Sequence, residues 1–296
     1  MALDRERLQK PTKKLRKLLK NFSRQPDQEE VHDLRTNIRQ LEALVNALQL
    51  DGKGNEQKLL KELTPVRRKA GKVRDMDVLT QFASTLQAGE EEDCRVALLE
   101  HLGAKRYRQA SKLGKLVQSE RTAIRKRLKR SFADVDNLLG DPKQPGSNGR
   151  ANADAAALSL QLASKLADPP RLDARNLHEY RKKVKELRYV LKFAENSDGD
   201  LVDTLGEVKD AIGEWHDWVE LAALADKALD HGSGCGLLRE IRAIGKTKFD
   251  HALSLTNQMR AKYVALAPKR KRGGGQARRT TRITKPVIAA TSAIAA

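Results

Sequence analysis

Two sequence motifs that each occur twice constrain the fold of this chain most strongly. Residues 31–41 (VHDLRTNIRQL) return as residues 177–187 (LHEYRKKVKEL), and residues 63–75 (LTPVRRKAGKVRD) return as residues 205–217 (LGEVKDAIGEWHD). Key histidine, acidic, basic and apolar positions of the two copies align without gaps. The copies are 146 positions apart for the first motif and 142 positions apart for the second, so the two offsets are nearly equal. Such repetition is typical of an internal duplication. We therefore expect two similar halves that pack about a pseudo-two-fold axis.

The repeated unit is expected to be helical throughout, so the predicted fold class is all-α. Apolar residues recur at steps of three and four, and no stretch alternates convincingly as a strand does. Helix boundaries are indicated by Asp27 before an acidic turn and by the polar segments 51–54 and 197–200. The strongest break is 141–149, which contains two prolines and two glycines. We expect four to five helices on either side of it.

These boundaries divide the chain into four segments. We expect a first helical half over residues 1–140, a linker over 141–150 and a second helical half over 151–267. Residues 268–296 contain eight lysines or arginines, three consecutive glycines and no acidic residue, so we expect a disordered basic tail. Such a tail either keeps the chain in solution or serves as a flexible arm for a polyanion.

Composition narrows the possible functions. Lysine and arginine number 58 against 39 acidic residues, a formal net charge of +19, which suits a polyanionic partner. Aromatic residues make up 4%, which argues against a base-stacking surface. No segment approaches the ~20 apolar residues of a membrane span, and the N-terminal residues lack the apolar core of a signal peptide. Cys94 and Cys235 show neither metal-ligand spacing nor a disulfide framework, so we expect a cytoplasmic protein with no membrane association.

Each copy of the first motif places a histidine and basic residues on one face of a helix, at steps of three and four. These stripes are His32, Arg35 and Arg39 in the first half and His178, Arg181, Lys185 and Arg188 in the second. Like charges on one face repel each other, whereas a solvated face normally mixes both signs. Two matched stripes therefore predict a binding site for a polyanion.

Other basic residues extend the candidate site. Some belong to the second motif, and others to the N-terminal helix or to the strongly basic segment 104–130. The predicted polyanion-binding residues outside the two stripes are Arg67, Arg74, Lys209, His216, Lys13, Lys17, Lys105, Arg108 and Lys112.

The order and spacing of four motifs resemble the CHAD domain, a helical domain named for its conserved histidines. The motifs are His32-x-x-Arg35-x-x-x-Arg39, residues 73–77 (VRDMD), His178-x-x-Arg181-x-x-x-Lys185-x-x-Arg188-Tyr189 and residues 213–217 (GEWHD). The resemblance covers about residues 4–265. It implies two four-helix bundles around a basic central channel that binds inorganic polyphosphate, in many members on polyphosphate granules. The second half departs from the family pattern at Trp218-Val219, where an Asp or Asn often follows as at Asp77.

Polyphosphate also suits these residues on physical grounds. It is a flexible chain of anionic oxygens, which arginine forks and lysine charges bind along a groove with release of counterions. We interpret Asp75, Asp77 and Asp217 as supports that orient a neighbouring Arg or His, or cap a helix, rather than as metal ligands. No cofactor is expected.

Two other functions stay open. The net charge also suits a protein that binds nucleic acid. Such binding would be nonspecific and would use the basic tail, because recognition motifs are missing from the sequence. A metal-dependent phosphohydrolase would use the dipeptides His32-Asp33 and His216-Asp217. However, adjacent helix residues point about 100° apart, and the first-half match of His216 is Arg74, which cannot ligate a metal. We therefore expect a binding protein without a metal, not an enzyme.

Overall fold

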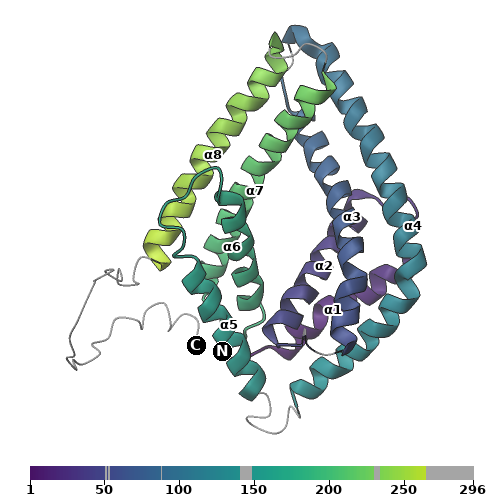
Figure 1. Ribbon diagram of the computed structural model, residues 1–296, viewed down its shortest axis with the longest axis vertical. Helices are drawn as coiled ribbons and strands as arrows, with labels where there is room; N and C mark the ends of the chain where they lie inside the picture. The colour runs from purple at the N-terminus through teal and green to yellow at the C-terminus, as the bar shows by residue number, and fades with distance from the viewer. Residues whose placement is uncertain (51, 53, 88, 141–148, 230–233, 265–296) are drawn as a thin grey trace, which may run out of the picture.

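The computed structural model describes residues 1–50, 52, 54–87, 89–140, 149–229 and 234–264. Across these ranges the chain forms eight α-helices and one short 3₁₀ helix, with no strand (Figure 1). This confirms the predicted all-α class. The predicted tail 268–296 lies outside the described residues, and so does most of the predicted linker 141–150.

The helices are α1 (Arg5–Asn21), α2 (Gln28–Ala47), α3 (Gly54–Ser84), the 3₁₀ helix η1 (Gly89–Glu91), α4 (Glu92–Leu138), α5 (Gly149–Lys165), α6 (Leu177–Leu191), α7 (Gly199–Ala228) and α8 (Gly236–Tyr263). In the described ranges, four α-helices precede residue 141 and four follow residue 148, at the lower end of the expected number. Because α5 begins at Gly149, the last two positions of the predicted linker are helical. None of these helices is both long enough and apolar enough to cross a membrane.

Side-chain caps explain where two of the helices begin. Asp27 accepts the backbone N–H of Glu30 at 2.8 Å, while the Glu30 carboxylate accepts the backbone N–H of Asp27 at 3.2 Å, which forms a capping box at α2. Asp198 caps α7 by accepting the N–H of Leu201 at 3.1 Å. The helix start at Asp27 and the boundary within 197–200 are therefore confirmed.

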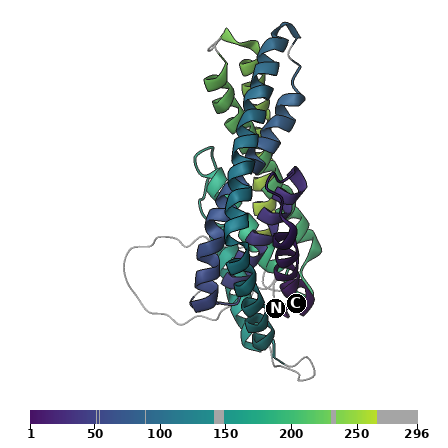
Figure 2. The same cartoon turned by 90° about the vertical axis from the view of Figure 1, so that its right-hand side faces the viewer.

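The long helices form two pairs that converge at one end of the molecule. α3 packs against α4 and α7 packs against α8, and both pairs run along the long axis (Figures 1 and 2). They meet where η1 and the start of α4 lie beside the start of α8, an end that we call the apex. α2 packs against α3 and α6 against α7, and across the two halves α2 contacts α6 and α3 contacts α7.

Three clusters of buried apolar residues hold this arrangement together. The first lies mainly in α1–α4 and the second mainly in α5–α8. The third lies towards the apex and joins both halves, with Leu98 and Met76 packed among residues such as Trp218 and Leu238. Phe82 also stacks on Trp218, with ring centroids 4.8 Å apart. Burial of this shared apolar surface stabilises the junction between the halves.

The first residues of the chain tie the halves together away from the apex. Leu3 and Ala194 form an isolated antiparallel bridge. The Asp4 N–H donates to the Phe193 carbonyl at 2.9 Å, and the Glu195 N–H donates to the Ala2 carbonyl at 2.9 Å. The segment that precedes α1 is therefore bound to the segment that follows α6 in the second half.

Candidate anion-binding site

The two predicted basic stripes meet where the halves face each other. α2 carries Arg35 and Arg39, α6 carries Arg181 and Lys185, and the two helices are in contact. Both α2 arginines, Arg181 and Arg67 of α3 are electrostatic neighbours of Lys185. We call these five half-buried residues the central basic cluster. The structure thus brings stripe residues from both halves into one group.

The members of this cluster disfavour one another's charge. Burial, followed by the charges of Arg39 and Arg181, lowers the pKa of Lys185 to about 7. Burial and the neighbouring charge of Arg35 lower the pKa of Arg39. Burial also lowers the pKa of Arg181, although the carboxylate of Asp217 opposes the shift. Cations whose charged forms are disfavoured in this way would be stabilised by a nearby anion.

Several guanidinium groups have buried N–H groups without a protein partner. Among the described residues, the Nε atoms of Arg16, Arg35, Arg39 and Arg125 and the Nη1 atom of Arg74 are buried and donate to no hydrogen-bond acceptor. An unsatisfied buried polar group costs ~1–3 kcal/mol, and most such groups in folded proteins are paired. The atoms of Arg35, Arg39 and Arg74 lie on α2 and α3, which also carry members of the central basic cluster, so an oxyanion there would gain hydrogen bonds.

Gly213 on α7 makes room for Arg181. The Arg181 Nε atom donates a hydrogen bond to the Lys209 carbonyl at 2.9 Å. A Cβ atom at position 213 would lie 2.9 Å from Arg181 Cζ, closer than real Cβ contacts. The glycine of the second motif therefore permits close approach of a side chain from α6, and its role is not to form a turn.

The same arrangement recurs two helical turns away. The Arg188 Nε atom donates to the Val202 carbonyl at 3.0 Å, and a Cβ atom at Gly206 would lie 3.0 Å from that Nε atom. Sequence reasoning did not identify Gly206. The signal was present, because Arg181 and Arg188 on α6 have the same seven-residue spacing as Gly206 and Gly213 on α7.

Two histidines of the second half form a pair. The rings of His178 on α6 and His216 on α7 are 4.2 Å apart in an edge-to-face arrangement. Burial, followed by His216 and Lys182, lowers the pKa of His178 to about 4, so its ring is neutral at pH 7. Its Nδ1 atom is buried and has no partner among the described residues. His32, the matched residue of the first half, is instead exposed on α2.

Asp75 and Asp217 lie among basic residues of α2, α3, α6 and α7. Burial raises the pKa of Asp75 although the charge of Arg35 opposes the shift. Burial likewise raises the pKa of Asp217 against the opposing charge of Arg181. Asp75 is an exposed residue, so the rise in its pKa comes from the protein atoms that surround the carboxylate and limit its hydration, and not from full burial. Both carboxylates thus partly offset the positive charge of their neighbours.

The family model described as the CHAD domain matches residues 6–226, which is most of the chain. The chain belongs to the CHAD family. The crystal structure of the CHAD domain from the plant Ricinus communis is similar to it, with a TM-score of 0.62 and 19% sequence identity. That match covers 90% of this chain and 95% of the plant chain, and it shows a shared fold. No curated protein matches this CHAD chain.

Two predicted binding residues of this CHAD domain are paired with acidic side chains. Arg67 Nε lies 2.6 Å from Glu42 Oε1, and Lys209 Nζ lies 2.6 Å from Asp210 Oδ1. Tyr189, whose pKa is raised by burial, is a further neighbour of the central basic cluster. Neither Glu42 nor Tyr189 is basic, so neither belongs to the basic stripes, although Tyr189 is the last position of the His178 motif.

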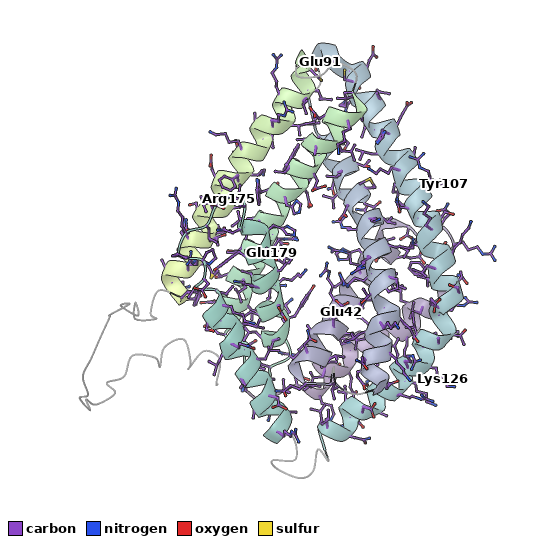
Figure 3. All side chains as sticks on the ribbon, in the orientation of Figure 1. Glu42, Glu91, Tyr107, Lys126, Arg175 and Glu179 are labelled. Carbon is purple, nitrogen blue, oxygen red and sulfur yellow. The ribbon has the colours of Figure 1, made fainter. Side chains whose placement is uncertain are left out.

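The remaining predicted residues of the CHAD domain lie on α1 and α4. None of them is among the electrostatic neighbours that most affect the pKa of Lys185. Side chains of α4 such as Tyr107 and Lys126 point outward (Figure 3). Eleven of the sixteen predicted binding residues therefore lie outside the central basic cluster. Six are elsewhere on α2, α3, α6 and α7, namely His32, Arg74, His178, Arg188, Lys209 and His216, and five are on α1 and α4, namely Lys13, Lys17, Lys105, Arg108 and Lys112.

Asp77 is bound by an arginine from α4. Arg106 Nε donates to Asp77 Oδ1 at 2.8 Å, and Arg106 Nη2 donates to the Pro26 carbonyl at 3.0 Å. These bonds connect α3, α4 and the segment before α2. The contact fits the supporting role expected of Asp77.

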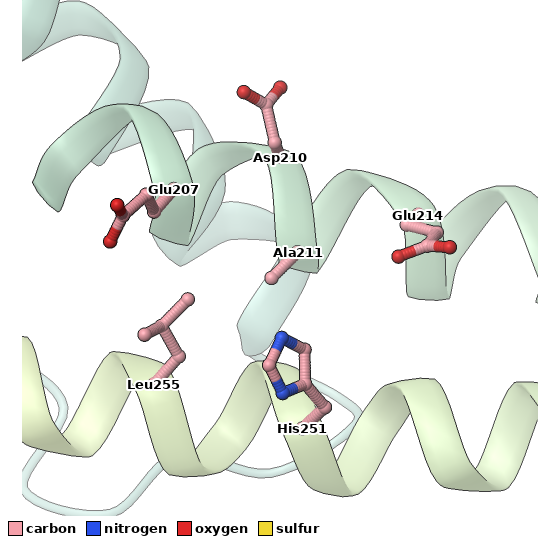
Figure 4. Close-up of a pocket in the computed structure, with 6 residues that line it drawn as sticks. All are labelled: Glu207, Asp210, Ala211, Glu214, His251 and Leu255. Atoms are coloured by element: carbon pink, nitrogen blue, oxygen red, sulfur yellow. The ribbon is translucent and has the colours of Figure 1, made fainter. Parts of the chain in front are cut away.

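A separate pocket of about 490 Å³ lies between α7 and α8 (Figure 4). Its lining residues are Glu207, Asp210, Ala211, Glu214, His251 and Leu255. Two of its carboxylates are already paired, Asp210 with Lys209 at 2.6 Å and Glu214 with Lys248 at 2.8 Å. No member of the central basic cluster lines this pocket, so it is distinct from the candidate anion-binding site.

Proposed function

We propose that this CHAD domain binds inorganic polyphosphate in a basic channel between its halves. The central basic cluster is the observation that carries the proposal. Arg35 and Arg39 have buried Nε atoms without a partner among the described residues, and both are neighbours of Lys185 on the other half. Several cations held together by the fold need a counter-charge, which a chain of phosphates would provide.

A linear polyanion suits the site better than a single phosphate does. The residues of the central basic cluster lie on α2, α3 and α6, and Arg188 continues the basic stripe along α6. Residues seven positions apart on a helix are about 10.5 Å apart, so the stripe from Arg181 to Arg188 extends beyond one phosphate group. A chain that contacts several cations at once gains affinity from the high effective concentration of its later phosphates.

Both halves would contribute equivalent walls to this channel. The repeated motifs, and the order of four helices before and four after the predicted linker, support a duplicated four-helix bundle. In this arrangement α2 corresponds to α6 and α3 to α7. The pairs Arg35 and Arg181, and Arg39 and Lys185, then line the channel from opposite sides of a pseudo-two-fold axis.

The proposed role is binding of polyphosphate without hydrolysis, and without a metal or cofactor at the central basic cluster. Among the described residues, neither His32-Asp33 nor His216-Asp217 joins a third metal-binding side chain at ligand distance. Affinity for the polymer would concentrate the protein on polyphosphate granules. Nucleic acid is the competing ligand, held nonspecifically by the basic tail 268–296.

Titration of labelled long-chain polyphosphate at several salt concentrations tests the proposal. We expect long-chain polyphosphate to bind far more tightly than orthophosphate and to displace oligonucleotide at a lower phosphate concentration. Affinity should fall by roughly 0.7 log units per tenfold rise in salt for each phosphate neutralised, taking single-stranded nucleic acid as the analogue. Equal affinity for orthophosphate, or an affinity that salt does not change, contradicts the proposal.

A further inference from the structure

Two cysteines and a glutamate meet at the apex, away from the central basic cluster. Glu91 ends η1, Cys94 lies in the first turn of α4, and Cys235 is the N-cap of α8. Glu91 stands at the tip of the molecule, where the two helices begin (Figure 3). Sequence spacing gave no sign of this group because the two cysteines lie in different halves.

The ligand atoms of these three side chains are close together. The Sγ atoms of Cys94 and Cys235 and a carboxylate oxygen of Glu91 all lie within 4.8 Å of one another. Only 7% of Cys94 and 2% of Cys235 is exposed, and both thiols are free. Tetrahedral ligands about 2.3 Å from a zinc ion are ~3.7 Å apart, so a small contraction would place all three around one ion.

Hydrogen bonds already fix the orientation of the carboxylate. Glu91 Oε1 accepts the N–H of Gly236 at 2.6 Å, and Oε2 accepts the N–H of Leu237 at 2.5 Å and the thiol of Cys235 at 3.4 Å. Ionised carboxylate oxygens have further lone pairs, so these bonds leave acceptor positions for a metal. Outer partners of this kind commonly orient metal ligands and strengthen metal binding.

We propose that Glu91, Cys94 and Cys235 bind a zinc-class divalent ion at the apex. Two thiolates and a carboxylate form a donor set that favours such an ion over magnesium or calcium, and water would take the fourth tetrahedral position. Binding releases the thiol protons to the buffer and leaves one net negative charge on the complex. The N-termini of α4 and α8 adjoin the site, and their dipoles favour that negative charge.

The bound ion would join the two halves of the domain. Glu91 and Cys94 come from the first half and Cys235 from the second. The neighbouring apolar cluster, which includes Leu98 and Leu238, already spans the same junction. A metal bridge here adds a direct link between α4 and α8 at the apex. The site is independent of the central basic cluster, so either proposal can fail without the other.

Cobalt(II) added to the reduced full-length protein, without phosphate, tests the site. Thiolate ligation gives a charge-transfer absorption, and a tetrahedral cobalt ion absorbs strongly in the visible range. We expect one equivalent of cobalt to produce both bands and one equivalent of zinc to remove them. The double variant C94S/C235S should lose the charge-transfer band and bind zinc at least a hundredfold more weakly. The variant E91Q keeps a side-chain oxygen that can accept a backbone N–H group at the start of α8, but it should bind zinc at least tenfold more weakly.

Thermal unfolding gives a second readout, and His101→Gln is the control because it removes an exposed histidine from α4. Zinc should raise the Tm of the wild type and of H101Q, and a chelator should reverse the rise. Zinc should leave the Tm of C94S/C235S unchanged. Absence of the thiolate band overturns the proposal, as does a band that survives C94S/C235S or an equal Tm rise in that variant.

Discussion

Raising the pH from 7 to 9 should weaken polyphosphate binding, and the effect should depend on Lys185. Burial, followed by Arg39 and Arg181, lowers the pKa of Lys185 to about 7 in the free protein. Bound polyphosphate brings negative charge to this lysine and shifts its pKa back towards the ordinary value of about 10.4. Above pH 7, binding therefore takes up a proton, so affinity falls as the pH rises. Below pH 7 the lysine is already charged, and its contribution to the pH dependence levels off.

The two pKa values of Lys185 set the size of this effect. If the pKa rises from about 7 to its ordinary value on binding, the association constant falls roughly 50-fold between pH 7 and pH 9, or about 2 kcal/mol. If solvent screening limits the bound pKa to about 8.5, the fall is roughly tenfold. The predicted range is therefore one to nearly two orders of magnitude.

Fluorescence anisotropy of labelled polyphosphate at constant ionic strength measures this dependence. The variant K185Q should bind weakly at every pH and lose most of the decrease between pH 7 and pH 9. The variant K126Q removes an exposed lysine from α4 and should keep the wild-type slope. A wild-type affinity that does not change with pH refutes the reasoning, and so does an unaltered slope in K185Q.

Three further predictions address stability, packing and the tail. The pKa of Lys185 is ~10.4 in the unfolded chain and about 7 in the folded chain. Burial of the charged lysine therefore lowers the free energy of unfolding by its full amount below pH 7, and this cost disappears as the pH rises towards 10. Calorimetry should therefore show that Lys185→Met raises the Tm by roughly a few degrees at pH 6 and by less at pH 9; a lower Tm at pH 6 contradicts this. Gly213→Ala should displace the Arg181 guanidinium and weaken polyphosphate binding in the titration. Gly71→Ala, at the matched first-half position where an added Cβ meets nothing within 4 Å, should leave binding unchanged and stabilise α3 by up to ~1 kcal/mol; equal effects on binding would argue against the role assigned to Gly213. A chain that ends at Leu266 should keep its helical circular dichroism and its specific polyphosphate affinity, whereas complete loss of binding would place the site in the tail.

Local signals in the sequence were sufficient for much of the fold. The helical period predicted the all-α class, and Asp27 predicted the start of α2 because a capping box needs only residues three positions apart. The order of four motifs identified the CHAD family, which the family comparison confirms. By contrast, the bridge between Leu3 and Ala194 joins residues from opposite halves, and no local pattern indicates it.

The candidate site was predictable where it depended on one face of one helix. The stripe residues Arg35 and Lys185 come together because α2 contacts α6. The other features of the site depend on contacts between helices, which the pattern along one helix does not predict. Glu42 neutralises part of the charge of Arg67, and Gly206 accommodates an arginine from α6. The exposed Lys112 on α4 has the same basic character as the stripe residues, but the helix that carries it packs elsewhere.

Polyphosphate affinity of two double variants tests most directly whether both halves form one site. Arg35→Ala with Arg39→Ala removes two charges from the first half, and Arg181→Ala with Lys185→Ala removes two from the second. Each pair should lower affinity by ~1.5–3 kcal/mol for every charged hydrogen bond that is lost in a desolvated contact, and by less where water screens it. Neither pair should unfold the protein, because removing like charges relieves repulsion in the free state.

The matched control is Lys126→Ala with Lys129→Ala, which removes the same charge from exposed positions on α4. We predict that both cluster variants weaken binding by at least tenfold more than this control does, at equal salt and with unchanged helical content. A control variant that weakens binding as much as the cluster variants would contradict the site, because bulk charge alone would then explain the affinity.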